Sequence, residues 1–282
     1  MTFLTPVVLS SCVPTAVGRG PQRIVCLTEE TTEWLYLLGQ QHKIVGISGY
    51  TVRPKQARHD KPRISAFLSA KIDQIMALEP DCVLGFSDLQ ADIANDLIRR
   101  GVQVTVFNQR SVAEIFNVLF QIAAMVGQAE QGLELLSGMR KQLLKIEREA
   151  MALPRRPRIY FEEWDEPHIS AIRWVSELLT IAGGDDCFAE LSSESLGKNR
   201  IIADSAEIMR RNPDIIIGSW CGKKFRPEKV AARLGWGDVN AVKNQQLLEI
   251  KSPEILQPGP AALTDGVAQM QRIVQQWAET YA

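Results

Sequence analysis

Hydrophobic and polar positions along this chain follow two alternating periods. Short runs rich in β-branched apolar residues, typical of buried strands, are followed by segments whose apolar residues recur every three or four positions, which is typical of helices. The strand-like runs lie at 23–27, 43–48, 81–86, 102–107, 158–161, 214–220 and 245–250. The helical patterns lie at 30–39, 72–80, 91–101, 173–184 and 205–213. This alternation predicts parallel sheets with helices on both faces, and therefore an α/β fold.

The segment from Ser111 to Leu153 interrupts the alternation and indicates a long helix. It contains no strand pattern, and its second half carries an apolar stripe at steps of three and four: Leu133, Leu136, Met139, Leu143, Ile146 and Ala150. Pro154 and Pro157 end the helix, because proline cannot donate the backbone hydrogen bond of a helix interior. We therefore expect two Rossmann-like lobes with parallel sheets bridged by one long α-helix. The expected divisions are a lead-in at 1–21, a first lobe at 22–110, the bridge at 111–154 and a second lobe at 155–282.

Two stretches of the chain also repeat one another. "DQIMALEPDCVLG" (73–85) and "AEIMRRNPDIIIG" (206–218) each pass from a helical pattern through Pro-Asp to an apolar run that ends at glycine. Such connectors are common in α/β proteins, so coincidence is an alternative. If the repeat is real, the lobes are equivalent halves. The carboxyl ends of their strands, where open α/β sheets bind ligands, then face a shared cleft.

Aromatic residues recur near the ends of several strand-like runs. Tyr50 ends "KIVGISGY", Phe86 ends "CVLGF", Trp164 follows "IYFEE" and Trp220 ends "IIIGSW", while Phe67 lies in "ISAFLSA". Core or loop packing explains any one of these rings equally well. Five rings near the ends of parallel strands favour a large flat ligand, because a ring supplies apolar contact area at little cost in conformational entropy.

Composition and charge narrow the range of partners. The 282 residues are 45% hydrophobic and 23% charged, which is ordinary for a globular protein. Lys plus Arg (32) nearly balances Asp plus Glu (33), so no net field attracts nucleic acid or an anionic membrane. The sequence contains no run of about 18 apolar residues that would predict a membrane-spanning helix. We expect a monomer whose partner is a small molecule.

The N-terminal segment leaves the compartment open. Its short apolar stretch follows no basic region and contains Pro6, which makes a poor signal peptide. "VLSSC" nevertheless resembles the site at which bacterial lipoproteins are cut and lipidated, which would place a lipid on Cys12; a disordered lead-in is the alternative. A periplasmic or lipid-anchored extracytoplasmic location and a cytoplasmic one are both compatible with this segment.

Motifs of the common enzyme classes are absent from the sequence. It contains no G-x-S-x-G, no H-E-x-x-H, no Walker loop and no G-x-G-x-x-G after a strand-like run. The five cysteines show no C-x-x-C spacing, so no zinc site is indicated. We therefore expect no catalysis and no catalytic cofactor.

Several ordered blocks resemble one known family. "RIVCLTEETTEWLYLLGQQHKIVGISGY", "IDQIMALEPD", the long helix and "LLTIAGGDDCF" resemble class III substrate-binding proteins of ABC importers for cobalamin, haem and ferric siderophores, and above all the cobalamin-binding branch. The resemblance spans roughly residues 22–280. It implies two lobes with limited hinge motion, a ligand between them and no catalysis. It also implies that Tyr50 contacts the ligand, and that Phe67 and Phe86 stand where the cobalamin binder has tryptophans.

The resemblance also places the loop in "IYFEEWDEPHISAIRW" (159–174) on the cleft wall, with Trp164 and His168 toward the ligand. Its four carboxylates can accept hydrogen bonds from the amides of a corrin ring, or form a solvated acidic turn: Glu162, Glu163, Asp165 and Glu166. Imidazole is a good ligand for iron or cobalt, although a lone histidine is more often a polar loop residue. The sequence-based site therefore contains no assigned metal ligand, and His168 is the one alternative.

Docking to a permease departs from the family pattern. The family uses one acidic residue in each lobe, seven positions before the proline of Pro-Asp. Asp73 holds that position in the first lobe, whereas the second lobe has Ala206 there and Glu207 next to it, about 100° further around the helix. The resemblance implies a corrinoid-binding protein that docks through Asp73 and Glu207. The alternatives are a haem or ferric-siderophore binding protein, and a soluble corrinoid-binding protein without an importer.

Overall fold

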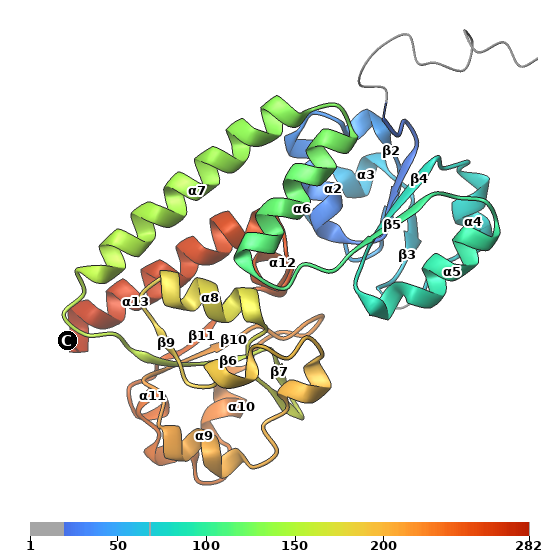
Figure 1. Ribbon diagram of the computed structural model, residues 1–282. Helices are drawn as coiled ribbons and strands as arrows, with labels where there is room; N and C mark the ends of the chain where they lie inside the picture. Colours follow the sequence, from blue (N-terminus) through green and yellow to red (C-terminus); the bar gives the residue numbers. More distant parts are fainter. Residues whose placement is uncertain (1–19, 68, 282) are drawn as a thin grey trace, which may run out of the picture.

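The computed structural model describes residues 20–67 and 69–281, so the lipidation site expected at Cys12 lies outside the described residues. Two lobes, each built on a parallel sheet, lie side by side, and the long helix α7 (Ala129–Met151) runs from one to the other (Figure 1). Within the described ranges, no helix combines the length and the apolarity needed to cross a membrane.

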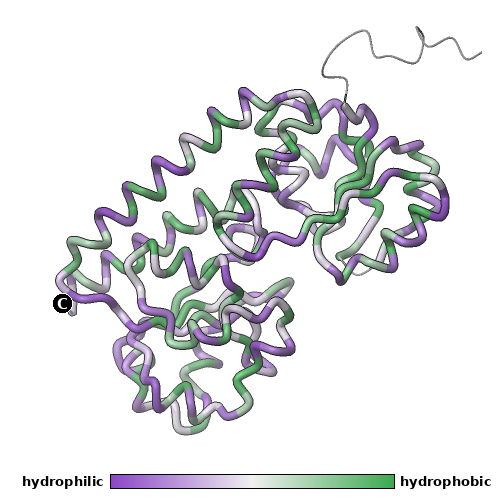
Figure 2. Tube along the Cα trace, viewed as in Figure 1, coloured by the Kyte–Doolittle hydropathy of each residue, from purple (hydrophilic) through white to green (hydrophobic). Residues whose placement is uncertain are grey.

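The first lobe is built on a five-stranded sheet in the order β3-β2-β1-β4-β5, with all neighbours parallel. Its strands are β1 (Ile24–Cys26), β2 (Ile44–Ser48), β3 (Arg63–Ser65), β4 (Cys82–Phe86) and β5 (Val104–Phe107). Its helices are α2 (Glu29–Leu37), α3 (Ala57–Asp60), α4 (Ile72–Ala77) and α5 (Ala91–Arg99). The central strands β1 and β4 are buried along their whole length, as their continuous apolar runs predicted. Figure 2 shows these hydrophobic segments inside the lobe.

The second lobe is built on a four-stranded parallel sheet in the order β11-β10-β6-β9. Its strands are β6 (Arg158–Glu162), β9 (Asp185–Asp186), β10 (Ile215–Gly218) and β11 (Leu247–Glu249), and a separate antiparallel hairpin consists of β7 (Trp164–Asp165) and β8 (His168–Ile169). Its helices are α8 (Arg173–Ile181), α9 (Ser205–Arg211), α10 (Pro227–Ala231), α11 (Asn240–Lys243), α12 (Ser252–Ile255) and α13 (Val267–Tyr281). The predicted α/β fold with two parallel sheets is confirmed.

The bridging segment consists of two helices rather than one. Helix α6 (Val112–Met125) ends before Gly127, which adopts a positive φ of 77° and turns the chain back into α7. The apolar stripe of α7 is buried as predicted, except at Leu133, which is 55% exposed. The neighbouring Gly132 is buried against α6 in its place. A Cβ added at position 132 would lie 2.4 Å from Ala123 Cβ of α6. The two helices therefore approach so closely that a larger residue does not fit.

The two repeated stretches adopt the same local structure. In each lobe a helix, α4 or α9, leads through Pro-Asp into a strand in the interior of the sheet, β4 or β10. Asp81 accepts the backbone N–H of Arg23 (2.9 Å), and Asp214 accepts that of Arg158 (3.0 Å). The guanidinium of Arg23 donates to a backbone carbonyl at the C-terminal end of α4, and that of Arg158 to one at the C-terminal end of α9. The aspartate of the repeat therefore secures the first strand of each lobe.

One hydrophobic cluster joins the two lobes. It extends from the first sheet through α6 and α7 to α8, α13 and the second sheet. The indole of Trp34 donates to Leu119 O (2.7 Å), and that of Trp174 donates to Ile255 O (2.9 Å). Since a close-packed interior resists deformation, we expect the lobes to rotate little relative to one another.

Candidate functional site

A pocket of about 490 Å³ lies between the lobes at the carboxyl ends of the strands. Open parallel sheets bind their ligands at this edge. The first lobe lines it with Phe67, Phe86, Leu89 and Arg110, which follow or end β3, β4 and β5. The second lobe contributes Glu163, Trp164, Pro167, Ile169, Ile172, Trp174, Ser195, Leu196, Gly197, Arg200 and Cys221, and the segment 256–258 completes the lining.

A buried glutamine positions the two phenylalanines. Gln90 has no exposed surface; its Oε1 accepts the backbone N–H of Phe86 (3.0 Å), and its Nε2 donates to Phe67 O (3.0 Å). The same side chain thus connects the end of β4 with the segment after β3. A buried amide whose oxygen and nitrogen are both satisfied is a rigid connection. The two rings are therefore held at a defined spacing on the wall of the first lobe.

The β7–β8 hairpin presents Trp164 on the opposite wall. Its indole Nε1 donates to Glu166 O (2.9 Å), and Lys223 Nζ lies 4.9 Å from the centre of its ring. Lys223 is held in turn by both carboxylate oxygens of Asp165, at 2.6 Å each. The lysine also lies 5.0 Å from the ring centre of Trp220. These contacts orient Trp164, whose side chain is half-buried and lines the pocket.

A buried ion pair supports the hairpin from behind. Arg200 is 1% exposed, and its Nη1 and Nη2 donate to the two oxygens of Glu163 at 2.7 and 3.0 Å. The guanidinium also donates to the backbone carbonyl of Ser170. Arg200 belongs to a 3-10 turn, η4 (Gly197–Arg200), which packs beside β8. The pair therefore fixes the start of the hairpin to the turn η4.

A second buried carboxylate, Glu162, ends β6. Arg233 donates to both of its oxygens (2.7 and 2.9 Å), the Trp220 indole donates at 3.0 Å, and His168 Nδ1 lies 3.3 Å away. Burial alone would raise the pKa of Glu162, but the proximity of His168 and the hydrogen bonds from Arg233 outweigh it and lower the pKa below the usual value. Glu162 is therefore a charged structural group beneath the hairpin.

These contacts change the interpretation of the acidic loop. The sequence suggested carboxylates that are free to accept hydrogen bonds from a ligand. Three of the four are already paired with basic side chains: Glu162 with Arg233, Glu163 with Arg200 and Asp165 with Lys223. Most of the negative charge of this loop is thus neutralised within the protein.

The six sequence-predicted ligand residues fall into two groups. Phe67, Phe86 and Trp164 line the interlobe pocket. Tyr50 is 55% exposed and lies outside this lining, and so does Trp220, which is 3% exposed and packs on Phe225. His168 also lies outside it, with its ring packed on Trp236. Contact between any of the six and a ligand stays a prediction.

Among the residues that shape the site, the sequence-based prediction did not include the polar side chains of Gln90, Arg110 and Arg200. Arg110 follows β5 by three positions, so the strand-end rule that selected the aromatic residues would have found it had it been applied to basic side chains. Gln90 and Arg200 stand in turns with no distinctive pattern. Nowhere in the described ranges do three His, Cys, Asp or Glu side chains form a group that could hold a metal ion.

The two predicted docking acids differ in their surroundings. Asp73, in the first turn of α4, has a side chain that is 92% exposed and pairs with Arg100 at 2.6 Å. Glu207, in α9, is 32% exposed, and its two oxygens pair with Arg210 (2.6 Å) and Arg211 (2.7 Å). The carboxylate in the second lobe is therefore already bound by two arginines of its own helix.

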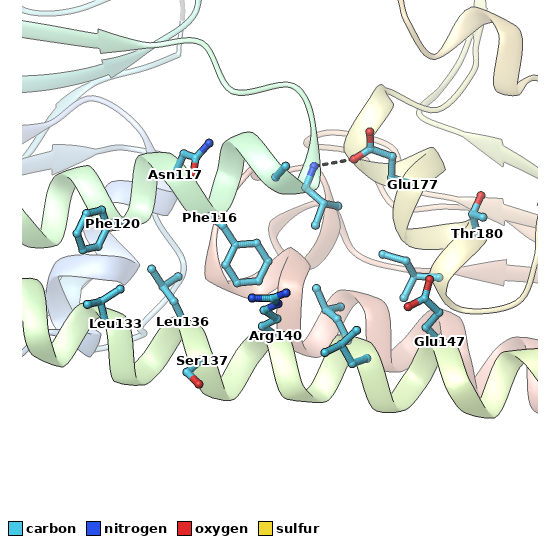
Figure 3. Close-up of a pocket in the computed structure, with 15 residues that line it drawn as sticks. Phe116, Asn117, Phe120, Leu133, Leu136, Ser137, Arg140, Glu147, Glu177 and Thr180 are labelled. Atoms are coloured by element: carbon cyan, nitrogen blue, oxygen red, sulfur yellow. Dashed lines mark hydrogen bonds between the residues drawn. The ribbon is translucent and has the colours of Figure 1, made fainter.

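A larger hollow, of about 970 Å³, lies between α6, α7 and α8. Figure 3 shows Phe116 and Arg140 extending toward one another from α6 and α7, and the hydrogen bond of 2.7 Å from Val112 N–H to Glu177. Apolar side chains such as Leu133 line much of this groove. It lies on helix faces rather than at strand ends, so we take the interlobe pocket as the candidate ligand site.

Comparisons of sequence point to one family. Residues 24–254 match the family described as periplasmic binding protein. An uncharacterized ABC transporter substrate-binding lipoprotein of Bacillus subtilis (strain 168), YvrC, is 24% identical over 263 residues, which cover 90% of this chain and 80% of the relative. A vitamin B12-binding protein of Vibrio campbellii is 23% identical over 223 residues, which cover 78% of each chain.

Solved structures share the architecture. The periplasmic vitamin B12 binding protein BtuF of Vibrio cholerae superposes with a TM-score of 0.74 at 20% identity, covering 93% of this chain and 99% of its own. The periplasmic heme-binding protein RhuT of Roseiflexus sp. RS-1 superposes with a TM-score of 0.75 at 19% identity, covering 91% of this chain and 100% of its own. At these identities the similarity establishes the fold, and the ligand has to be argued from the pocket.

Proposed function

This chain belongs to the periplasmic binding protein family, and from that premise we propose that it captures a corrinoid in the pocket between its lobes and presents it to an ABC importer. A protein of this kind binds its ligand and releases it unchanged, so no catalytic step is assigned to any residue. The observation that carries the proposal is the set of rings that meet from both lobes at the strand ends: Phe67, Phe86 and Trp164.

The pocket suits a flat and largely apolar ligand. Its volume of about 490 Å³ lies within the range of small-molecule sites. Each ring that packs on the face of a macrocycle contributes about 1–3 kcal/mol from its apolar area. Gln90 and Lys223 hold the rings in place before the ligand arrives, which reduces the entropy lost on binding.

Haem is the second candidate, because solved haem-binding proteins share this fold. Protein ligands to haem iron are His, Cys, Met or Tyr side chains. Cys221 is the one such side chain among the described residues of the lining. A corrinoid, whose cobalt brings its own ligands, makes no such demand and is therefore preferred.

An importer partner implies a location outside the cytoplasm, either in the periplasm or at a membrane through a lipid. The similarity to an ABC transporter substrate-binding lipoprotein supports this location. We assign the contact with the permease to Asp73 and Glu207, on equivalent helices of the two lobes. Recovery of the native protein from the cytosolic fraction would favour a soluble corrinoid-binding protein without an importer.

Calorimetry with the purified protein tests the ligand. Cyanocobalamin and dicyanocobinamide are titrated beside hemin, and we expect saturable binding of a corrinoid with one ligand per chain. Absorption spectroscopy of the loaded protein identifies what is held. Hemin binding without any corrinoid binding would put the second candidate in place of the first, and the His168→Ala variant would then show whether that imidazole takes part.

A further inference from the structure

Resting on the proposed function, we propose that the ligand carries an acidic group and that Arg110 is the side chain that receives it. The specificity of the site then lies in one oxyanion, a carboxylate or a phosphodiester, at the edge of a flat macrocycle. Three observations lead to this inference: the charge of the lining, the unused donors of Arg110 and, among the described residues of the opposite wall, a single carboxylate that is already paired.

The charged residues of the pocket lining do not balance. Within the described part of the chain they are Arg110, Arg200 and Glu163, so basic groups exceed acidic ones by one. Glu163 is bound by Arg200 through both of its oxygens. The excess positive charge therefore belongs to Arg110, which stands on the other lobe.

Arg110 has most of its hydrogen-bonding capacity unused. A guanidinium carries five N–H donors. One of them donates to Asn108 Oδ1 (2.9 Å), and the exposed Asp88 lies 3.6 Å away, beyond good hydrogen-bonding distance. Its Nε is buried and has no hydrogen-bond partner. Arg200, by contrast, directs both terminal nitrogens to Glu163.

The position of Arg110 fits contact with a ligand that packs on the aromatic wall. Its guanidinium lies 4.8 Å from the centre of the Phe86 ring, which lines the same pocket. The side chain is 13% exposed, and burial, the leading cause, lowers the pKa of its guanidinium, with Arg200 across the pocket acting in the same direction. A bound anion would favour the charged guanidinium and so offset both effects. An arginine in this state is therefore better matched to a charged ligand group than to an amide.

Corrinoids offer the matched ligands that the test needs. Dicyanocobyrinic acid carries carboxylates where dicyanocobinamide carries amides on the same ring, and cyanocobalamin adds a single phosphodiester. We expect wild-type protein to bind the carboxylate form about tenfold more tightly than the amide form, because a hydrogen bond to a charged partner outweighs one to a neutral partner. Tighter binding of cyanocobalamin than of dicyanocobinamide, lost on changing Arg110, would identify the phosphodiester as the acidic group.

The variant Arg110→Gln should remove this preference, because a neutral side chain gains little from a charged partner, so the variant should bind the acid and amide forms with affinities within about twofold of each other. Arg110→Lys, which keeps the charge, should retain part of it, and Arg99→Gln, at an exposed arginine of α5, should retain all of it. Thermal melting of each variant confirms that the fold is intact.

Two results separate this inference from the proposed function. Equal binding of the acid and amide forms by wild type, or an unchanged preference in Arg110→Gln, would overturn the role of Arg110 while leaving corrinoid capture in place. If no corrinoid binds, the proposed function fails, and protoporphyrin IX and its dimethyl ester provide the same comparison on another macrocycle. Equal affinities for that pair, or no binding of either, would overturn the inference as well.

Discussion

Arg200 and Glu163 form a bidentate ion pair, with Nη1–Oε2 and Nη2–Oε1 distances of 2.7 and 3.0 Å, that fixes the β7–β8 hairpin beside the candidate ligand pocket. The arginine is 1% exposed, whereas the carboxylate side chain is 21% exposed. The more deeply buried member of this pair is therefore the cation.

Removing the carboxylate of Glu163 should therefore destabilise the folded protein. Glu163→Gln leaves the Arg200 charge buried without its partner, and we expect a loss of about 3 kcal/mol in the free energy of unfolding. Urea denaturation measures it. Arg226→Gln, which removes an exposed pair with Glu228 at 3.6 Å, should change stability little. Equal effects of the two substitutions would show that the buried pair has no special role.

Trp164 should contribute to affinity more than to folding. Its ring lines the pocket on a two-stranded hairpin, so Trp164→Ala should weaken corrinoid binding by about tenfold or more, since 1.4 kcal/mol is a factor of ten. Calorimetry measures the affinity, and a melting curve close to that of wild type shows that the fold is retained. Trp164→Phe, which keeps a ring, should recover most of the loss. An unchanged affinity in Trp164→Ala would remove this ring from the site.

The first turn of α2 should make stability depend on pH. Burial raises the pKa of Glu29 to about 7 and that of Glu30 to about 8. Glu30 accepts from Thr28 Oγ1 (2.6 Å), its other oxygen has no partner, and Gly259 covers it so closely that a Cβ there would lie 2.4 Å from Glu30 Cβ. These carboxyl groups bind protons more tightly in the folded chain than in the unfolded chain. Their contribution to stability is therefore complete below the ordinary pKa of 4.5 and is lost as the pH rises through about 8.

Denaturation of Glu30→Gln and wild type between pH 5 and 9 tests this dependence. The variant should lose less stability than wild type as the pH rises, and should be the more stable of the two at pH 9. Glu134→Gln, at an exposed position of α7, should follow the wild-type curve. A Glu30→Gln curve parallel to that of wild type would show that Glu30 is ionised in the folded protein.

Permease docking should depend more on the first lobe than on the second. Asp73 is 92% exposed with one basic partner, whereas both oxygens of Glu207 are held by arginines of α9. Charge reversal by Asp73→Lys should therefore reduce uptake of labelled cobalamin by the native host more than Glu207→Lys does, and the double variant should abolish it. Ligand affinity should not change, because neither residue lines the pocket. Normal uptake by the double variant would point to a protein that works without an importer.

The sequence by itself determined the fold class and predicted part of the pocket lining, whereas contact of these residues with a ligand stays a prediction. Continuous apolar runs mark buried strands, and apolar residues at every third or fourth position mark helices, because side chains repeat their direction at a different interval in each element. The alternation of the two patterns leads to parallel sheets covered by helices. Three of the predicted ring residues, Phe67, Phe86 and Trp164, line the interlobe pocket, because parallel strands bring their carboxyl ends together at one edge of a sheet. The stripe on α7 was correct except at Leu133, where the close approach of α6 to Gly132 decides which residue is buried.

Only the tertiary structure decided the charge of the site. The acidic loop reads as four carboxylates, but Glu163 meets a partner 37 residues away, Asp165 one 58 residues away and Glu162 one 71 residues away. Such pairs depend on loops that the sheets bring together, and no local pattern encodes which loops meet. The same packing buries Trp220 outside the pocket lining. It leaves Arg110 in the lining with N–H donors that no described protein group accepts. Periodicity therefore determines which residues reach an edge of the sheet, and long-range packing determines which of their polar atoms stay free.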